Sequence, residues 1–110
     1  MDVRRCDIYM ADLRRINPEC GIRPVIVVQN DKGNCHSSSY IVALVTSRKK
    51  KELPTHFVIQ SNCGLRKNST VMCEHLMTVD REMLIEYVGT IVNTDDEEML
   101  DKALSTSLQI

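Results

Sequence analysis

The stretch Arg23-Pro24-Val25-Ile26-Val27-Val28-Gln29-Asn30 is the strongest structural signal in the sequence. Consecutive β-branched residues favour an extended strand, and an apolar run without alternation is typical of a strand buried on nearly both faces. Residues 31–34, which follow, have the composition of a turn. The next apolar run covers residues 40–45, with Thr46 at its end. These features predict two neighbouring strands at the centre of a sheet.

The segments around this centre predict further β-structure. We expect strands over 7–13, 55–59, 70–76 and 87–92, a loop over 14–22, and a short helix over 80–87. A C-terminal helix should begin after Thr94, because Thr94 and Glu97 have the spacing of a capping box. The apolar face of this helix is expected to carry Leu100, Ala103, Leu104, Ser107 and Leu108. The predicted fold is a small, strongly bent antiparallel sheet with a C-terminal helix packed on it.

Composition limits the number of domains and the kinds of site. At 110 residues with 43% apolar content, the chain predicts a single domain over 1–110. No apolar run approaches the ~20 residues of a membrane span, and the first residues lack a signal-peptide pattern, so we expect a cytoplasmic protein with no membrane partner. Five cysteines without a Cys-x-x-Cys pair favour free thiols. No quartet of ligands with metal-binding spacing is present, and the sequence predicts neither a metal site nor a cofactor.

Charge is distributed unevenly along the chain. Residues 1–56 hold ten Lys/Arg and six Asp/Glu, whereas residues 57–110 hold four and nine. A basic N-terminal half is what a domain with one basic face would show, and such a face can follow a phosphate backbone. The run 48–51 supplies four of these cations, although a single charge run also fits an ordinary solvated loop.

The search for catalytic motifs leaves one arrangement. The sequence lacks a Gly-x-Ser-x-Gly elbow, a His-Glu-x-x-His pair and a Gly-rich phosphate loop. Arg23 stands at the start of one predicted strand and Thr46 at the end of its neighbour, so the two would meet on one rim, where a guanidinium and a hydroxyl form a phosphate-binding pair. The three histidines, His36, His56 and His75, are scattered, and an acid–base mechanism using two of them stays open.

Five segments, in order, resemble the MazF/PemK family of ribonuclease toxins. Residues 5–13 are similar to the family's opening Arg-Gly-Asp-Ile/Val-Tyr-x-Ala-Asp-Leu, and residues 23–31 to its Arg-Pro-Val-Leu-Val-Ile-Gln-Asn-Asp. Residues 53–56 match its Leu-Pro-Thr-His. Residues 73–80 resemble its Glu-Gln-Ile-Arg-Thr-Ile-Asp block, and residues 103–108 follow its Ala-Leu-x-x-Ser-Leu ending. The chain departs from the pattern at Cys6, which replaces a glycine, and at His75, which replaces a glutamine.

The resemblance implies a fold, an activity and partners. The fold would be an SH3-like small barrel of the CcdB/MazF/PemK type, mainly β within the α+β class. The activity would be sequence-specific, metal-independent cleavage of single-stranded RNA, by a homodimer that a cognate antitoxin neutralises. In the family pattern the catalytic pair corresponds to Arg23 and Thr46, with Glu19 the nearest match to an assisting glutamate. RNA contacts are implied for Gly21, Asn30, Ser47, Lys49, Glu74 and His75.

Such a reaction needs few groups from the protein. RNA carries its own nucleophile, the 2′-OH, so that an enzyme has to align it, stabilise the phosphorane and move protons. Arg23 suits charge stabilisation and is a poor base, while the general base stays open between Glu19 and His75. Two alternatives are a CcdB-like gyrase inhibitor, whose C-terminal Trp-Gly-Ile is missing here, and a degenerate member that only binds RNA or antitoxin. The basic N-terminal half further predicts that an acidic antitoxin tail competes with RNA.

Overall fold

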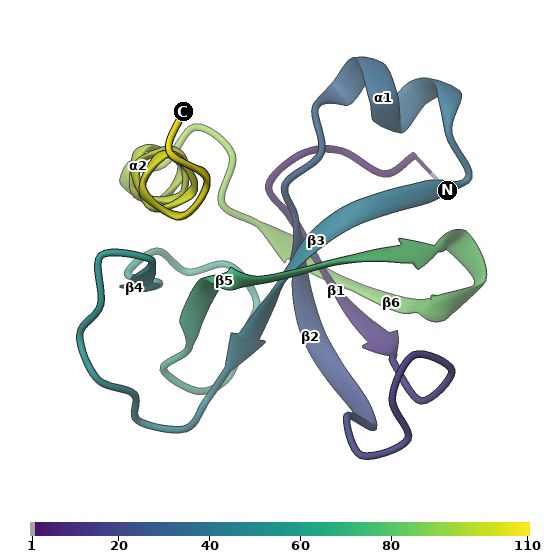
Figure 1. The fold of residues 1–110 in the computed structure, drawn as a ribbon, viewed down its shortest axis with the longest axis horizontal. Coiled ribbons are helices and arrows are strands. Elements are labelled where there is room, and N and C mark those ends of the chain that lie inside the picture. The colour runs from purple at the N-terminus through teal and green to yellow at the C-terminus, as the bar shows by residue number, and fades with distance from the viewer. Residues whose placement is uncertain (1) are drawn as a thin grey trace.

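Six strands form one antiparallel sheet in the order β4-β5-β3-β2-β1-β6 in the structure, a computed structural model that describes residues 2–110 (Figure 1). The strands are β1 (Asp7–Asp12), β2 (Ile22–Val27), β3 (Ser39–Thr46), β4 (His56–Val58), β5 (Thr70–Asp80) and β6 (Leu84–Thr90). Helix α1 (Asp31–His36) joins β2 to β3, a short 3-10 turn η1 (Arg81–Met83) joins β5 to β6, and helix α2 (Asp95–Leu108) ends the chain.

The central position of β2 follows from its side chains. Val25, Ile26 and Val27 are fully buried, which confirms the prediction of a strand covered on both faces. β2 pairs with β1 on one side and with β3 on the other, in registers that place Ile26 opposite Ile8 and Ala43. Each of these positions continues an apolar row across the sheet. The β-branched run therefore fixes the middle of the fold, as the sequence predicts.

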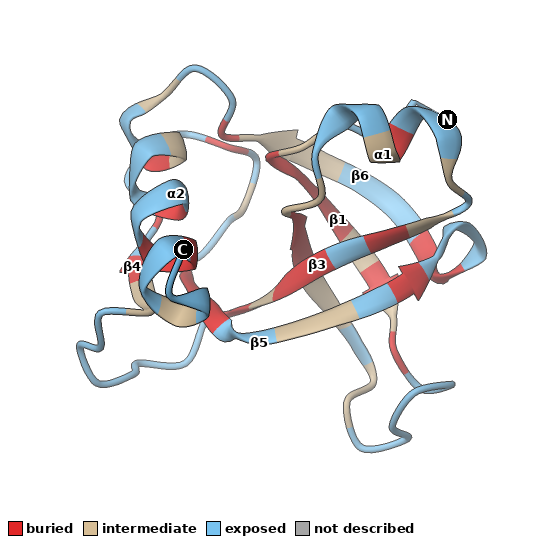
Figure 2. Cartoon of the chain, turned by 45° about the horizontal axis from the view of Figure 1, so that its top comes forward, coloured by how far each residue is buried: buried red, intermediate tan, exposed pale blue. Residues whose placement is uncertain are grey.

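Each face of the sheet has its own apolar core. Alternate residues of the strands point to opposite sides, so Ile8 and Ile26 join one core while Tyr9 and Val25 join the other. Helix α2 covers the first core and turns its buried residues toward the sheet (Figure 2). The second core is enclosed by the bent sheet itself and includes Tyr40, Val42, Val79, Met83 and Leu84.

Two predicted connections differ from the structure. Residues 31–34, expected as a turn, belong to helix α1, because the Asn30 side chain accepts a hydrogen bond from the Gly33 amide at 2.8 Å and caps the helix. The helix expected over 80–87 is wrong: only the three residues of η1 are helical, and β6 already begins at Leu84. Pairing of Leu84 with Ala11 of β1 explains the difference, because tertiary pairing outweighs a weak helical pattern.

The C-terminal helix is confirmed, with a different cap. Leu100, Ala103 and Leu104 are buried as predicted, whereas Leu108 is half exposed. The Thr94 hydroxyl donates to the carbonyl of Ile91 instead of capping the helix, and the Glu97 carboxylate accepts from the Asn93 amide. The boundary was therefore predicted correctly, although the reciprocal bonds of a capping box do not form.

The loop 59–69 lies so close to β6 that two glycines are required there. A Cβ on Gly89 would lie 1.8 Å from the Cys63 carbonyl oxygen, and a Cβ on Gly64, where φ is +95°, would lie 2.2 Å from that of Val88. Such distances exclude any side chain. This close approach joins the loop that precedes β5 to β6 at the edge of the sheet and helps to close the barrel.

Cys6 occupies a backbone position suited to glycine. Its φ is +78°, in the left-handed region that costs other residues conformational energy. This geometry gives a physical reason for the glycine of the family pattern. The Cys6 side chain is fully buried beside β1, and burial raises the pKa of its thiol to about 12. Cys6 therefore contributes apolar packing rather than thiolate chemistry.

Within residues 2–110, no helix is both long enough and apolar enough to cross a membrane.

Candidate active site

The candidate site opens where β2 and β3 separate. The two strands pair from Val27 with Val42 to Val25 with Leu44, and the pairing stops there. Continuing the same register by two residues would place Arg23 opposite Thr46. Pro24 lies between Arg23 and the last pair, and it has no amide hydrogen to give to a ladder. The strands diverge at this point, and Arg23 and Thr46 face the space between them.

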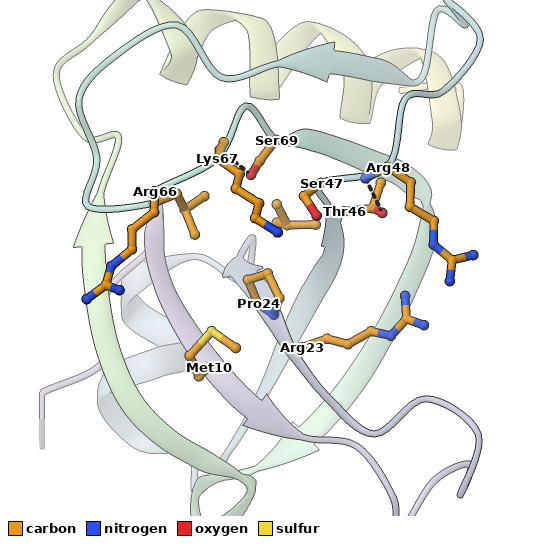
Figure 3. Close-up of a pocket in the computed structure, with 11 residues that line it drawn as sticks. Met10, Arg23, Pro24, Thr46, Ser47, Arg48, Arg66, Lys67 and Ser69 are labelled. Carbon is orange, nitrogen blue, oxygen red and sulfur yellow. Dashed lines mark hydrogen bonds between the residues drawn. The ribbon is translucent and has the colours of Figure 1, made fainter.

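A pocket of about 390 Å³ fills this space (Figure 3). This volume lies within the roughly 300–1,000 Å³ typical of ligand-binding pockets and is larger than one phosphate group needs. One wall comes from the start of β2 and the end of β3, and the other from the loop 59–69 and its junction with β5. The lining residues are Met10, Arg23, Pro24, Val45, Thr46, Ser47, Arg48, Leu65, Arg66, Lys67 and Ser69.

Arg23 is held by its backbone surroundings with most of its donors unused. The chain reaches it through Gly21, whose φ of +65° allows the turn that begins β2. The Arg23 Nε donates to the Cys20 carbonyl at 2.7 Å, which orients the guanidinium. A guanidinium has five N–H donors, so four remain on the two Nη atoms. A half-buried, oriented fork with free donors is suited to binding two oxygens of a phosphate.

Thr46 is buried at the end of β3, on the same wall of the pocket as Arg23. It is 6% exposed, and its Oγ1 accepts a hydrogen bond from the Arg48 amide at 3.2 Å. Its hydroxyl hydrogen has no acceptor among the residues that the structure describes. The hydroxyl is therefore free to donate, and an anionic oxygen is a strong acceptor.

The pocket is lined by cations and by no carboxylate. Four of the lining residues, Arg23, Arg48, Arg66 and Lys67, are basic, and none is acidic. The ion pairs found over residues 2–110 lie elsewhere and involve none of these four side chains. A pocket with unpaired positive charge attracts anions, and the field is strengthened by the low-dielectric protein around it.

The loop 59–69, which forms the second wall, is anchored by a buried carboxylate. Asp96, near the start of α2, is 2% exposed. It accepts hydrogen bonds from the Gln60 amide at 3.1 Å, the Ser61 amide at 2.8 Å and the Ser61 hydroxyl at 2.6 Å. At the other end of the loop the Ser69 hydroxyl donates to the Lys67 carbonyl at 2.9 Å. The backbone that carries Arg66 and Lys67 is thus fixed at both ends.

The structure brings only some of the predicted site residues together. Arg23 and Thr46 line the pocket together, as their positions in the sequence predict, and Ser47, an RNA contact implied by the resemblance, lines it beside them. Glu19 lies in the exposed loop between β1 and β2, where its amide donates to the Asn17 side chain at 3.0 Å, and it does not line the pocket. Asn30 caps α1 and lines a different groove, beside the end of α2.

The remaining RNA-contact predictions fall outside the pocket. Gly21 contributes its carbonyl to a hydrogen bond with the Leu13 amide and shapes the loop before Arg23. Lys49 is exposed in the loop after β3. Glu74 and His75 lie on β5, at an irregularity in its pairing with β3. None of these four residues lines the pocket, and their proposed contacts with RNA stay predictions.

Glu74 joins β5 to the basic loop that follows β3. Its carboxylate contacts the His56 Nε2 at 2.5 Å and accepts from the Thr55 hydroxyl at 3.0 Å. The other ring nitrogen of His56 contacts the Lys51 carbonyl at 3.0 Å. Partial burial raises the pKa of Glu74, but hydrogen bonds from its own amide, His56 and Thr55 outweigh that effect and lower it overall. His75 Nε2 lies 3.9 Å from the same carboxylate.

Sequence reasoning missed the second wall of the pocket. Arg66, Lys67 and Ser69 line it, although none was a candidate. A signal was present: Arg66-Lys67 is the only pair of adjacent cations in the acidic half of the chain, and it follows the turn residue Gly64. Its distance from Arg23 along the chain concealed the proximity. In the described part of the chain, no three His, Cys, Asp or Glu side chains gather in a way that would hold a metal ion.

Comparison with known proteins gives a consistent match over the whole chain. Residues 4–108 match the model of a family described as PemK-like, MazF-like toxin of type II toxin–antitoxin system. The chain is also 39% identical to a protein of Bacillus subtilis (strain 168) named endoribonuclease EndoA, over 100% of this chain and 97% of that protein.

Solved structures with low sequence identity share the fold. An endoribonuclease in complex with its cognate antitoxin, from a mycobacterial species, superposes with a TM-score of 0.85 at 21% identity, over 98% of this chain and 96% of that one. The Mycobacterium tuberculosis toxin MazF-mt6 gives 0.79 at 22% identity, over 94% and 97%. MazF from Deinococcus radiodurans gives 0.78 at 18% identity, over 100% and 99%. The predicted fold class, a mainly β small barrel with a C-terminal helix, is confirmed.

Proposed function

Because this chain belongs to the family of PemK-like, MazF-like toxins of type II toxin–antitoxin systems and is an endoribonuclease, we propose that it cuts single-stranded RNA at a specific sequence, without a metal ion, by attack of the RNA 2′-OH on the adjacent phosphate. The products would be a 2′,3′-cyclic phosphate and a 5′-hydroxyl. The observation that carries this proposal is the juxtaposition of Arg23 and Thr46 across one cationic pocket.

The scissile phosphate is placed between these two side chains. The free Nη donors of Arg23 bind its non-bridging oxygens and stabilise the charge that develops in the phosphorane, and the Thr46 hydroxyl donates to one of the same oxygens. The guanidinium can also supply a proton toward the leaving 5′ oxygen. The lining supports metal-independent chemistry, because it offers neither the carboxylates nor the imidazoles that would bind a divalent cation.

The proton acceptor must come from outside the pocket lining, which contains no Asp, Glu or His. Glu19 is our candidate, because its exposed loop leads directly into Gly21 and Arg23. His75 is the other candidate. The pH dependence of cleavage separates them: the Glu19→Gln variant should lose the limb of the profile that reports the base, and His75→Gln should keep it.

The partners follow from the family and from charge. We propose a homodimer, supported by the exposed apolar side chains of Ile41, Leu108 and Ile110 along one groove. We also propose that a cognate antitoxin inhibits the enzyme by laying an acidic segment over the cationic pocket. Association with the antitoxin should slow as salt rises, because salt screens the attraction between the acidic segment and the cationic pocket. At physiological ionic strength this attraction reaches only about one Debye length, ~8 Å. Elution at 12.5 kDa in size-exclusion chromatography would refute the dimer.

One experiment tests the reaction itself. RNA incubated with the purified protein is sequenced at its new ends, with and without excess EDTA. We expect cuts at one short motif in both samples, with cyclic phosphate on the upstream fragment. An oligonucleotide with a 2′-deoxy sugar at the cut site should be resistant, because it lacks the nucleophile. Equal cleavage of that oligonucleotide would refute the mechanism, and absence of any cleavage would favour a protein that only binds RNA or antitoxin.

A pair of variants tests the two proposed catalytic residues. Arg23→Ala should abolish cleavage while circular dichroism stays unchanged, because the side chain lies at a strand end rather than in either core. Thr46→Val should cost less, since it removes one neutral donor to the phosphate, whose bond contributes about 1 kcal/mol, or somewhat more to a charged group, together with the acceptor of the Arg48 amide. Near-normal turnover by a folded Arg23→Ala protein would refute the site.

A further inference from the structure

The second wall of the pocket carries a cation with no assigned role. The ammonium group of Lys67 points toward the middle of the pocket, on the side of Ser47 and Pro24, while the guanidinium of Arg66 points outward (Figure 3). Lys67 is exposed, and it takes part in none of the ion pairs of residues 2–110. A lysine aimed into an open pocket without a carboxylate partner is suited to an anionic ligand.

The backbone beneath Lys67 is held by several hydrogen bonds. Asp96 holds the loop at Gln60 and Ser61, the Ser69 hydroxyl holds the Lys67 carbonyl, and the Ile59 amide donates to the Ser69 carbonyl at 2.9 Å. At the intervening turn Gly64 packs so closely on β6 that an added Cβ would lie 2.2 Å from the Val88 carbonyl oxygen. Holding a flexible side chain on a rigid base lowers the entropy lost when it binds a ligand.

One phosphate does not account for this wall. Arg23 and Thr46 lie on the β2–β3 wall and suffice for the scissile phosphate, while the pocket extends across to the loop 59–69. A polynucleotide bound at Arg23 must continue beyond that phosphate in both directions, and the next phosphate needs its own counter-charge. Phosphate contacts of this kind position a nucleic acid and contribute most of its affinity.

We propose that Lys67 binds the phosphate next to the scissile one, so that the pocket takes two successive phosphates of a single RNA strand. The proposal rests on the proposed endoribonuclease function. Lys67 fixes the register of the strand, and Arg23 and Thr46 act on the phosphate that this register delivers to them. Lys67 is thus an RNA-binding residue that sets affinity, with little part in the chemical step.

Salt dependence gives the first test. The probe is an oligoribonucleotide that contains the mapped cut motif with a 2′-deoxy sugar at the cut site. Each lost phosphate contact lowers the slope of log K against log salt by about 0.7 for a single strand. Lys67→Gln should show this reduction and bind roughly three- to tenfold more weakly. Lys67→Arg, which keeps the charge, should keep the slope. Lys102→Gln, the same charge change on α2 outside this pocket, should match wild type.

A chemical double-mutant cycle identifies the phosphate. Two further probes carry a neutral methylphosphonate in place of the phosphate on the 5′ or the 3′ side of the scissile one. One of them should weaken binding by wild type and have no further effect on Lys67→Gln. Equal losses for both proteins with both probes, or a Lys67→Gln slope equal to that of wild type, would overturn the proposal while leaving the cleavage activity established. A wild-type protein that cuts no RNA would instead refute the proposed function.

Discussion

Replacing Asp96 by Asn should weaken the fold through the loop 59–69. The substitution keeps the size of the side chain but turns one acceptor oxygen into an NH2 group. The remaining oxygen can take the place of Oδ2 and accept from Ser61, so the NH2 group faces the Gln60 amide, where two donors meet. The buried carboxylate now accepts three donors at 2.6–3.1 Å. Losing one charge-assisted bond and leaving one amide unpaired should together cost about 2–4 kcal/mol in the free energy of unfolding.

Urea denaturation followed by circular dichroism measures this loss. All proteins are compared at one concentration, because the stability of the proposed dimer would depend on it. Asp95→Asn is the matched control. Asp95 is exposed in the same first turn of α2, so its replacement removes the same favourable charge at the helix N-terminus, about 0.3–1 kcal/mol, and no loop contact. Equal losses for the two variants would refute the reasoning, since they would reduce the role of Asp96 to its charge at the helix end.

Three further perturbations probe other features. Gly89→Ala should destabilise the protein severely in the same denaturation assay, because its Cβ would meet a carbonyl oxygen at 1.8 Å, whereas Gly33→Ala in α1 meets only a flexible side chain at 3.3 Å and should be tolerated. Iodoacetamide at pH 8, followed by mass spectrometry, should modify the exposed Cys35 and spare the buried Cys6, whose thiol pKa is about 12; equal labelling would contradict the burial. The lowered pKa of Glu74 means that its carboxylate stabilises the folded state above the ordinary pKa of ~4.3 and stops doing so as the pH falls through the lower folded value. The difference in urea midpoint between wild type and Glu74→Gln should therefore shrink as the pH is taken from 6 to 3, and a difference independent of pH would argue against the Glu74 contacts.

The sequence predicted the parts of the fold that depend on local pattern. The buried strand around Ile26, the strand ending at Thr46 and the helix after Thr94 all form where expected. The failure at residues 80–87 has a physical cause: a short segment with few helical contacts becomes a strand because β1 offers it a partner at Ala11. Pairing between segments more than 70 residues apart leaves no trace in local periodicity.

The candidate site, like the fold, was predictable only where it depends on local sequence pattern. Arg23 and Thr46 could be placed together because they stand at the ends of strands whose adjacency the pattern suggests. Lys67 could not, because the position of its loop depends on Asp96 of α2 and on the contact of Gly64 with Val88 of β6, and both of these partners are distant from the loop in the sequence. Local chemistry and family resemblance point to the β2–β3 wall as the proposed catalytic one, and only the folded arrangement reveals the opposite wall.

The two walls of the pocket also differ in how freely they can change over evolution. Arg23 and Thr46 extend directly from the strands that form both cores, so altering their backbone would disturb the whole molecule. The loop 59–69 contributes its side chains from outside the sheet and is attached through a few discrete contacts. Substitutions and length changes between those attachment points can accumulate without harm to stability or to chemistry. Under the proposed role of Lys67, one scaffold can in this way change how tightly it holds an RNA strand while its reaction stays constant, and the same division makes this loop the first place to engineer RNA affinity.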